Sequence, residues 1–381
     1  MDALSETPFV SDKRPGAERS RAAQQDLRVR AEPPDFAEVR ALLAAEERAA
    51  RGRRVVVAEY LCTPERTLLF GARADWAEPR VRPVRLDHAV LRRFAASTFR
   101  APSGVSLMRD LTDGGMAAWH MFAPLLAPLA DWSEPDDVIY LVPHGLLHDL
   151  PLHTLPLGGV PLIERNPVCY VPASAVLRHT LGGPALTASK RAPAAAVFGD
   201  ARGDLRHARQ EAAAVAAMFG VTAELGEAVT RGRALEALET AGVVHIAGHG
   251  RLSTGDGFAS RLDLADREVL LAGDLLGRRS RAGLAVLSGC ETGVSEQRPG
   301  DEVVGFIRAL LLSGVRSIVA SQWRVADAST QDLLCGFHRA ARDRELPLAE
   351  ALRQTVREIR KDRRYGHLYH WGGFALVGSW R

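Results

Sequence analysis

Short apolar runs alternate with helical patterns over most of this 381-residue chain. Apolar runs typical of buried strands occupy residues 138–142, 194–199, 243–249, 284–290, 317–321 and 374–378. Between them apolar residues recur every three or four positions, which predicts helices at residues 211–219, 231–240, 303–312, 327–342 and 348–360. Strands that alternate with helices indicate an α/β fold: a mainly parallel central sheet with helices on both faces.

The N-terminal part follows a different pattern. Residues 1–34 are polar and charged without periodicity, which predicts a disordered arm. Residues 35–135 are predicted to form a strand-and-helix subdomain that packs onto the main sheet, and residues 136–381 form the main domain. The elements predicted in the subdomain are helices at 35–51, 86–99 and 114–129 and a hairpin at 55–61 and 67–70. A second hairpin is predicted at 260–272.

Two of the apolar runs stop at a reactive side chain beside glycine. Residues 243–250 end in Gly-His249-Gly, and residues 284–292 contain Ser-Gly-Cys290-Glu-Thr. Ligands of open parallel sheets bind just beyond the carboxyl ends of the strands. A histidine and a cysteine at the ends of two neighbouring strands indicate a thiolate nucleophile, Cys290, with its base, His249.

The backbone beside these residues can serve the same chemistry. A tetrahedral acyl intermediate carries an oxyanion, which two backbone N–H groups can bind. Gly250 has no Cβ, so its N–H can approach a substrate closely. The N–H of Cys290 is the natural second donor.

Composition narrows the class of protein. The 49 basic and 46 acidic residues give a net charge of +3, which argues against a dedicated nucleic-acid surface. The longest apolar stretches fall short of the roughly 20 residues of a membrane helix, and no signal peptide is visible. The four cysteines have no metal-site or disulfide spacing. We therefore expect a soluble, cytoplasmic protein in which Cys290 is a free thiol and Cys62, Cys169 and Cys335 belong to the core.

Two further stretches accompany the histidine and cysteine segments. Residues 142–151 read Val-Pro-His-Gly-Leu-Leu-His-Asp-Leu-Pro, and residues 300–327 contain Gly-Asp-Glu-Val-Val-Gly-Phe and Ala-Ser-Gln-Trp-Arg-Val. In this order the four motifs resemble those of CHAT-domain proteases, a caspase-like family often attached to tetratricopeptide repeats. The resemblance runs from about Val55 to the C-terminus. The chain departs from the family at His144, where aspartate is usual, and shows no repeat array.

The resemblance implies a caspase-like three-layer sandwich and peptide-bond cleavage by a Cys–His dyad. Cys290 attacks the scissile carbonyl, and His249 acts first as base and then as acid. No third orienting residue is assigned. The resemblance also suggests bacterial antiviral defence or regulated cell death. The expected partners are one or a few protein substrates, such as a pore-forming or regulatory protein encoded nearby, and an activating protein. No cofactor, metal, nucleic acid or membrane is expected.

Other residues have two interpretations. We expect substrate binding by Asp301, Glu302, Ser321 and Trp323, which flank the pocket in the resemblance. Alternatively, Asp301 and Glu302 complement the dipole of a helix that begins there, and Trp323 is an aromatic residue at the core edge. His245 is expected to support the site by packing or hydrogen bonding. A zinc site of His245, His249 and Cys290 lacks a fourth ligand with suitable spacing.

Two rival functions stay open at this point. A catalytically silent scaffold that signals by binding would not need both Cys290 and His249. A cysteine hydrolase of small esters or amides would keep the dyad but use a closed apolar pocket. Cleavage of proteins, as opposed to small esters alone, separates the endopeptidase from this hydrolase.

Overall fold

The computed structural model describes residues 34–381 apart from several gaps: 51, 64, 100–112, 182–193, 252–256, 290–295, 299–301 and 324–325. For residues 113–114, 296–298 and 302–304 only the backbone is described. The arm expected over residues 1–34 lies outside the described residues except for Pro34. Cys290 and Asp301 also lie outside them.

An eleven-stranded sheet forms the centre of the described chain, in the order β3-β2-β1-β4-β7-β18-β17-β14-β10-β8-β9. Pairing within it is mainly parallel, and the antiparallel pairs are β1–β2, β2–β3 and β17–β18. Because β1 pairs with β4, the strands of the N-terminal part continue the main sheet. The strands are β1 Val55–Cys62, β2 Thr67–Ala72, β3 Arg80–Val84, β4 Val138–Val142, β7 Val168–Tyr170, β8 Ala195–Gly199, β9 Glu224–Leu225, β10 Val243–Gly248, β14 Leu284–Gly289, β17 Ser317–Ser321 and β18 Phe374–Gly378.

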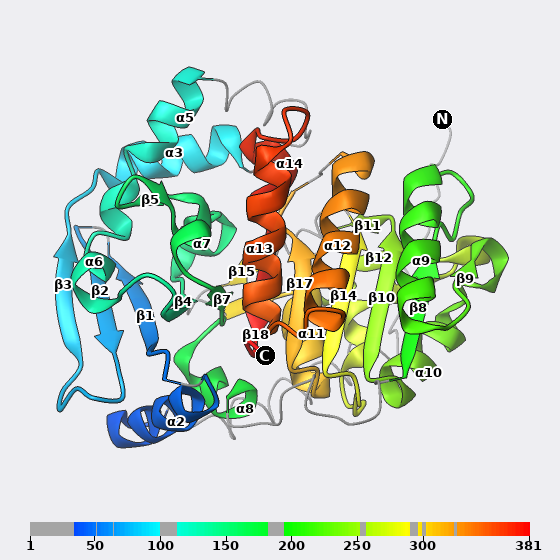
Figure 1. The fold of residues 1–381 in the computed structure, drawn as a ribbon, viewed down its shortest axis with the longest axis horizontal. Helices are drawn as coiled ribbons and strands as arrows, with labels where there is room; N and C mark the ends of the chain where they lie inside the picture. Colours follow the sequence, from blue (N-terminus) through cyan, green and yellow to red (C-terminus); the bar gives the residue numbers. More distant parts are fainter. Residues whose placement is uncertain are drawn as a thin grey trace, which may run out of the picture. The chain divides into compact units, whose positions relative to one another are not determined.

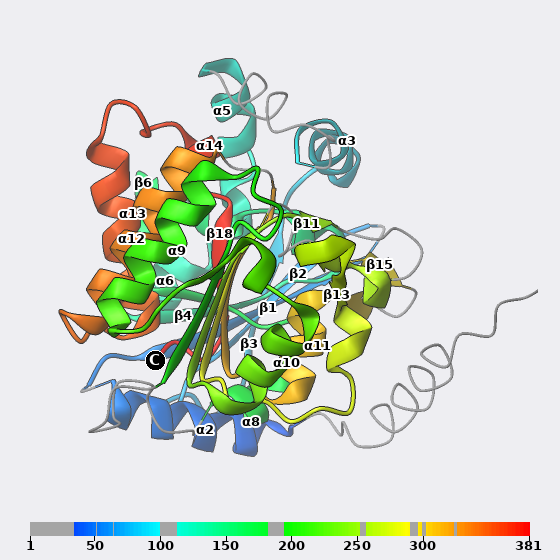
Figure 2. The ribbon, with the colours of Figure 1, turned by 90° about the vertical axis from the view of Figure 1, so that its right-hand side faces the viewer.

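Helices cover both faces of this sheet, as predicted. Figure 2 shows α9, α12 and α13 on one face and α10 and α11 on the other. The helices are α2 Phe36–Ala49, α3 His88–Thr98, α5 Asp113–His120, α6 Leu129–Trp132, α7 Leu162–Arg165, α8 Leu177–Thr180, α9 Arg206–Phe219, α10 Arg231–Thr240, α11 Phe306–Ser313, α12 Asp327–Arg342, α13 Leu348–Lys361 and α14 Leu368–Trp371. No helix among the described residues combines the length and apolar character needed to cross a bilayer.

Three small sheets accompany the central one. The first, β11-β12-β13, follows β10 directly and includes the hairpin expected at 260–272. The pairs β15–β16 and β5–β6 are two-stranded. Their bounds are β5 Pro156–Leu157, β6 Val160–Pro161, β11 Gly250–Arg251, β12 Arg261–Asp263, β13 Val269–Leu271, β15 Glu296–Arg298 and β16 Glu302–Val304.

Figure 1 shows α12 and α13 in front of the central strands. The alternation of side chains along β14 explains why helices cover both faces of the sheet. Leu284 and Val286 join the apolar core under α12 and α13, whereas Ala285 and Leu287 join the core under α10 and α11. Successive residues of a strand point to opposite faces, so a continuous apolar run is needed where both faces are covered. These two cores make the structure a three-layer α/β sandwich.

Helix α9 packs very closely on β8. A Cβ on Gly199, the last residue of β8, would lie 2.5 Å from the Cβ of Ala212 and 3.0 Å from the backbone oxygen of Ala208. Such contacts are too short for real carbon atoms, so the absence of a side chain at Gly199 fixes how near α9 lies to the sheet.

Three predicted elements have different bounds in the structure. The helix expected at 114–129 is broken into α5, a 3₁₀ turn at Ala123–Leu125 and α6, because Pro124 and Pro128 lack the N–H that a continuous helix needs. The helix expected from Val303 begins at Phe306, since Glu302–Val304 form strand β16. Helix α9 begins at Arg206, five residues before the predicted start at Glu211.

Candidate active site

Strands β10 and β14 bring the histidine and cysteine segments together. They are parallel neighbours, and Gly248 lies opposite Gly289 in their register. His249 follows Gly248 directly, and Cys290, which lies outside the described residues, follows Gly289 in the sequence. The register therefore places Gly289, which precedes Cys290 in the sequence, beside Gly248, which precedes His249.

The backbone of His249 is held by the small sheet β11-β12-β13. Its carbonyl accepts a hydrogen bond of 2.9 Å from the N–H of Asp263. This bond makes Gly250 and Leu262, which lie opposite each other, a non-hydrogen-bonded pair. In such a pair the N–H groups point away from the partner strand, so the Gly250 N–H is directed away from β12.

The side chain of His249 has a carboxylate partner that sequence reasoning missed. Its Nε2 lies 2.9 Å from Oδ1 of Asp204, in the turn between β8 and α9. The hydrogen bond with His249 is the main reason why the pKa of Asp204 is lower than usual. A carboxylate can only accept hydrogen bonds, so Nε2 of His249 carries the proton and Nδ1 of the neutral ring is the basic nitrogen.

Buried Asp200 fixes the turn that carries Asp204. Its Oδ1 accepts a hydrogen bond of 2.8 Å from the N–H of Leu205, and its Oδ2 accepts one of 2.8 Å from Nε of Arg209. Asp200 has a φ of 50°, a left-handed conformation that Asp tolerates better than most residues. These hydrogen bonds stabilise the turn, and the turn holds Asp204 beside His249.

Asp263 joins the two elements that carry Asp204 and His249. It accepts from Arg202 of the β8–α9 turn at 2.9 Å and from Arg261 of β12 at 3.1 Å. Arg251 of β11 lies 3.5 Å from the same carboxylate. The carboxylate is mostly buried, so these ion pairs are screened less than exposed ones, and they tie the turn to the small sheet.

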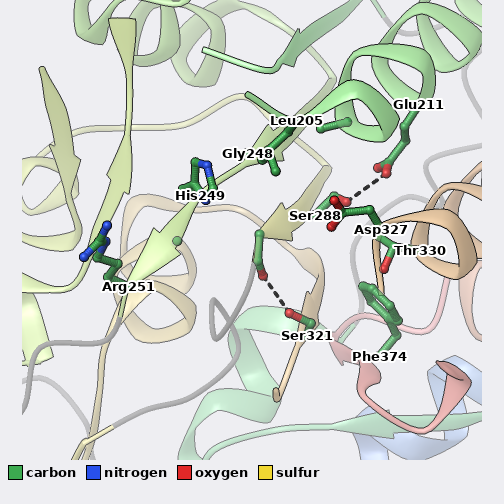
Figure 3. Close-up of a pocket in the computed structure, with 13 residues that line it drawn as sticks. Leu205, Glu211, Gly248, His249, Arg251, Ser288, Ser321, Asp327, Thr330 and Phe374 are labelled. Atoms are coloured by element: carbon green, nitrogen blue, oxygen red, sulfur yellow. Dashed lines mark hydrogen bonds between the residues drawn. The ribbon is translucent and has the colours of Figure 1, made fainter. Parts of the chain in front are cut away.

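A pocket of about 340 Å³ opens beside His249 (Figure 3). Gly248, Gly250, Ser288 and Gly289 form the side nearest the strand ends, and Leu205, Ala208 and Phe374 supply apolar surface. Asp327, at the start of α12, and Ser321 also line it. The pocket is large enough for a side chain and reaches the residue that precedes Cys290.

Glu211 and Ser288 line this pocket, and the buried His245 and His338 extend from Glu211 into the interior. Glu211 of α9 is 1% exposed, and its Oε2 accepts a 3.0 Å hydrogen bond from Oγ of Ser288. Its Oε1 lies 2.9 Å from Nε2 of His245, although the two groups are not aligned as a hydrogen bond. Nδ1 of His245 lies 3.1 Å from Nε2 of His338 of α12. Burial, and secondarily the nearby His245, lowers the pKa of His338 well below its usual value, so His338 is neutral.

The four residues expected to bind substrate have different surroundings. Ser321 lines the pocket, but its side chain is buried and Oγ donates a 2.6 Å hydrogen bond to the carbonyl of Gly289. Trp323 is 5% exposed, donates to the carbonyl of Tyr369 and packs against Phe99. It therefore offers a substrate little surface. Asp301 lies outside the described residues, and Glu302 is described only as part of the backbone of β16.

Comparisons with known proteins agree with this architecture. A family model described as "CHAT domain" matches residues 116–379. Two crystal structures of the separase–securin complex from Saccharomyces cerevisiae match with TM-scores of 0.56 and 0.53 at 11% and 12% identity. They cover 90% and 95% of this chain, which in turn covers 31% of the matched chain in each. These similarities define an α/β protein with a caspase-like fold.

Curated relatives extend the comparison. The chain is 24% identical to human tetratricopeptide repeat protein 28 over 272 residues, and 23% identical to the mouse protein over 254 residues. The matched regions cover 62% and 57% of this chain but only 11% and 10% of those proteins. Because the family model covers more than half of it, the chain belongs to the CHAT domain family.

Proposed function

We propose that this protein is a cysteine endopeptidase that uses Cys290 as nucleophile and His249 as base. The observation that carries the proposal is the pairing of His249 with Asp204 at the edge of a pocket that reaches Gly289. The pairing presents Nδ1 as the basic nitrogen of a half-exposed ring, which is what a general base for a thiol requires.

The proposed reaction has two steps. Nδ1 of His249 takes the thiol proton of Cys290 while the sulfur attacks the scissile carbonyl. The imidazolium then returns the proton to the leaving amine, and a thioester remains on Cys290. In the second step His249 activates a water molecule that hydrolyses the thioester, which releases the acid product and restores the thiol.

Other groups have supporting roles in this mechanism. Asp204 holds the tautomer of His249 and stabilises the imidazolium, as the carboxylate of a catalytic triad does. The N–H groups of Gly250 and Cys290 bind the oxyanion, and the register of β11 supports this for Gly250. The apolar wall and Asp327 of the pocket contact the substrate side chain nearest the cut. Trp323 stays a candidate for substrate binding, whereas the hydroxyl of Ser321, the other expected candidate, is bonded to Gly289.

Two alternatives compete with this proposal. A scaffold acting by protein binding has no use for a base whose tautomer is fixed by Asp204, so the site favours an enzyme. A non-peptidase acyl hydrolase would use the same dyad and is separated only by its substrates. As in the family resemblance, we propose one or a few protein substrates, in defence or regulated cell death, and an activating partner.

Peptide-library cleavage read by mass spectrometry tests the proposal. The purified protein is compared with Cys290→Ala and with Cys62→Ala as the matched control. Burial raises the pKa of Cys169 well above its usual value and that of Cys335 to about 12, so these two thiols do not compete with Cys290 for a thiol-directed probe at neutral pH.

Cleavage by the wild type and Cys62→Ala but not by Cys290→Ala supports the endopeptidase. Hydrolysis of small thioesters without any peptide cleavage favours the acyl hydrolase. If no variant hydrolyses either substrate and the probe does not label Cys290 ahead of the other cysteines, the protein is a scaffold.

A further inference from the structure

The end of strand β14 is held by side chains from both sides. On one side Oγ of Ser288 donates a 3.0 Å hydrogen bond to Glu211 of α9. On the other, Oγ of Ser321 from β17 donates a 2.6 Å hydrogen bond to the carbonyl of Gly289. Figure 3 draws both bonds at the pocket. Ser288 and Gly289 are the two residues before Cys290.

These bonds begin where the backbone ladder ends. β14 pairs with β17 only from Leu284 to Leu287, opposite Ser317 to Ala320. On its other side β14 stays paired with β10 through Gly289. Beyond this ladder the bond from Ser321 to the carbonyl of Gly289 continues the contact between β14 and β17, and the bond from Ser288 to Glu211 ties β14 to α9.

The side chain of Glu211 contacts the central sheet rather than solvent. It is 1% exposed on the face of α9 that packs against the sheet, and its described partners are Ser288 and His245. Burying a carboxylate costs free energy unless polar partners compensate for the lost water. The positions of Glu211 and of its partners therefore depend on one another. His245 is in turn held by His338, so the support extends from α9 through β10 to α12.

We propose that Glu211 and Ser321 are positioning residues that fix the end of β14 and hence the starting point of Cys290. The role of Cys290 rests on the proposed function, but the support of Ser288 and Gly289 does not. Neither residue takes part in proton transfer: each acts through the two residues that precede the nucleophile. A displacement of about 1 Å at a reacting group lowers rates by up to about a hundredfold.

The experiment compares Ser321→Ala, Glu211→Gln and the double variant with the wild type. Ser317→Ala is the matched control, because Ser317 is also buried on β17 and donates to a carbonyl, that of Ser379, but at the far end of the strand. Ser321→Thr keeps a hydroxyl and serves as the rescue. The readouts are backbone amide exchange of the peptide that contains residues 286–292, the rate of Cys290 alkylation by iodoacetamide against pH, and kcat and KM for a cleaved peptide.

We expect amide exchange of residues 286–292 to quicken by about tenfold in Ser321→Ala and Glu211→Gln, while other peptides exchange as in the wild type. We expect kcat to fall by about tenfold with little change in KM, and Ser321→Thr to recover most of both. Exchange that quickens equally throughout the protein, or that matches Ser317→Ala, overturns the proposal. If wild-type protein cleaves no peptide, the endopeptidase fails, and amide exchange and alkylation still decide whether the support exists.

Discussion

His245 and His249 stand four residues apart in the same segment, yet the structure gives them opposite environments. His249 lies past the end of β10 at the pocket edge, 32% exposed, with the exposed Asp204 as its partner. His245 lies inside β10, with no exposure, between Glu211 and His338. The first can meet a substrate and exchange protons with it, whereas the second can only hold its neighbours.

The difference separates the site into a rim and a floor. The rim consists of His249, Asp204 and the turn that carries Asp204. The floor consists of Glu211 and Ser288, which line the pocket, together with the buried His245 and His338 to which Glu211 connects them. Exposed ion pairs contribute little to stability, so changes at the rim should alter activity alone, whereas changes in buried groups should alter stability or alignment.

The sharpest test of the rim is His249→Ala. Loss of a general acid–base group lowers kcat/KM by about 10²- to 10⁴-fold. The melting temperature should stay within the range of the control His120→Ala, because His249 is partly exposed and its partner is exposed. A variant that kept more than a tenth of the wild-type kcat/KM for peptides would show that His249 is not the base.

Trp323→Ala tests whether this tryptophan belongs to the hydrophobic core or contacts the substrate. A side chain that is 5% exposed and packed on Phe99 should lose about 3–5 kcal/mol of unfolding free energy on truncation. Denaturant unfolding measures the loss, with the exposed Met121→Ala as control. An unchanged unfolding free energy combined with a raised KM would place Trp323 in the substrate pocket instead.

Asp204→Asn separates orientation from charge at the rim. An amide can still contact Nε2 of His249 but cannot stabilise the imidazolium. Because Asp204 is exposed, we expect a loss of about tenfold in kcat/KM, well below the ~10⁴-fold loss at a buried triad carboxylate. Unfolding free energy should change by less than about 1 kcal/mol, because the contact between Asp204 and His249 is exposed. The matched control is Asp266→Asn, at an exposed residue of the same charge; equal kinetics in the two variants would remove Asp204 from the mechanism.

Acid titration probes the buried histidines. Burial lowers the pKa of His153 to about 3 and that of His338 well below its usual value. The unfolded chain binds these protons below about pH 6.5 and the folded chain does not, so stability is full above that pH and falls as the pH drops. Each histidine changes the unfolding equilibrium by at most about tenfold per pH unit. His153→Gln should give a shallower fall than the wild type, and an equal slope would contradict neutral burial of His153.

The positions of most central strands could be predicted from the sequence because their apolar runs are continuous. Strands β10 and β14 end within a residue of their predicted limits, and their register brings together the segments that carry His249 and Cys290. The strands β3, β7 and β9 were missed. β7 and β9 are very short, and β3 is an edge strand whose Arg-Val-Arg-Pro sequence has no apolar run.

The partners of the site were harder to predict than the dyad. Asp204 precedes His249 by 45 residues and lies in a turn without any periodic pattern, so only the fold brings them together. Glu211 did carry a signal. It falls in the stripe of Ala208, Ala212 and Val215, all of them buried, and a charged residue in the apolar stripe of a helix indicates a buried polar contact.

The roles expected for Ser321 and Glu302 depended on details that a linear pattern does not contain. Ser321 ends a strand at the pocket, as expected, but its hydroxyl is directed at Gly289. Glu302 stands in β16, where pairing with β15 overrides the helical pattern of the following residues. Both outcomes result from pairing or hydrogen bonding with another strand, which local periodicity cannot report.

The glycine at the end of β8 gives a last consequence, for how inactivating substitutions are mapped. Asp204 and Glu211 flank the point where α9 meets Gly199, and no methyl group fits between that glycine and Ala212. Gly199→Ala would move the helix outward and shift both carboxylates at once, although no group of the site is altered. A genetic screen for loss of activity should therefore recover substitutions at Gly199, which does not contact a substrate. A map of the active site drawn from such a screen would include residues that only position the reacting groups.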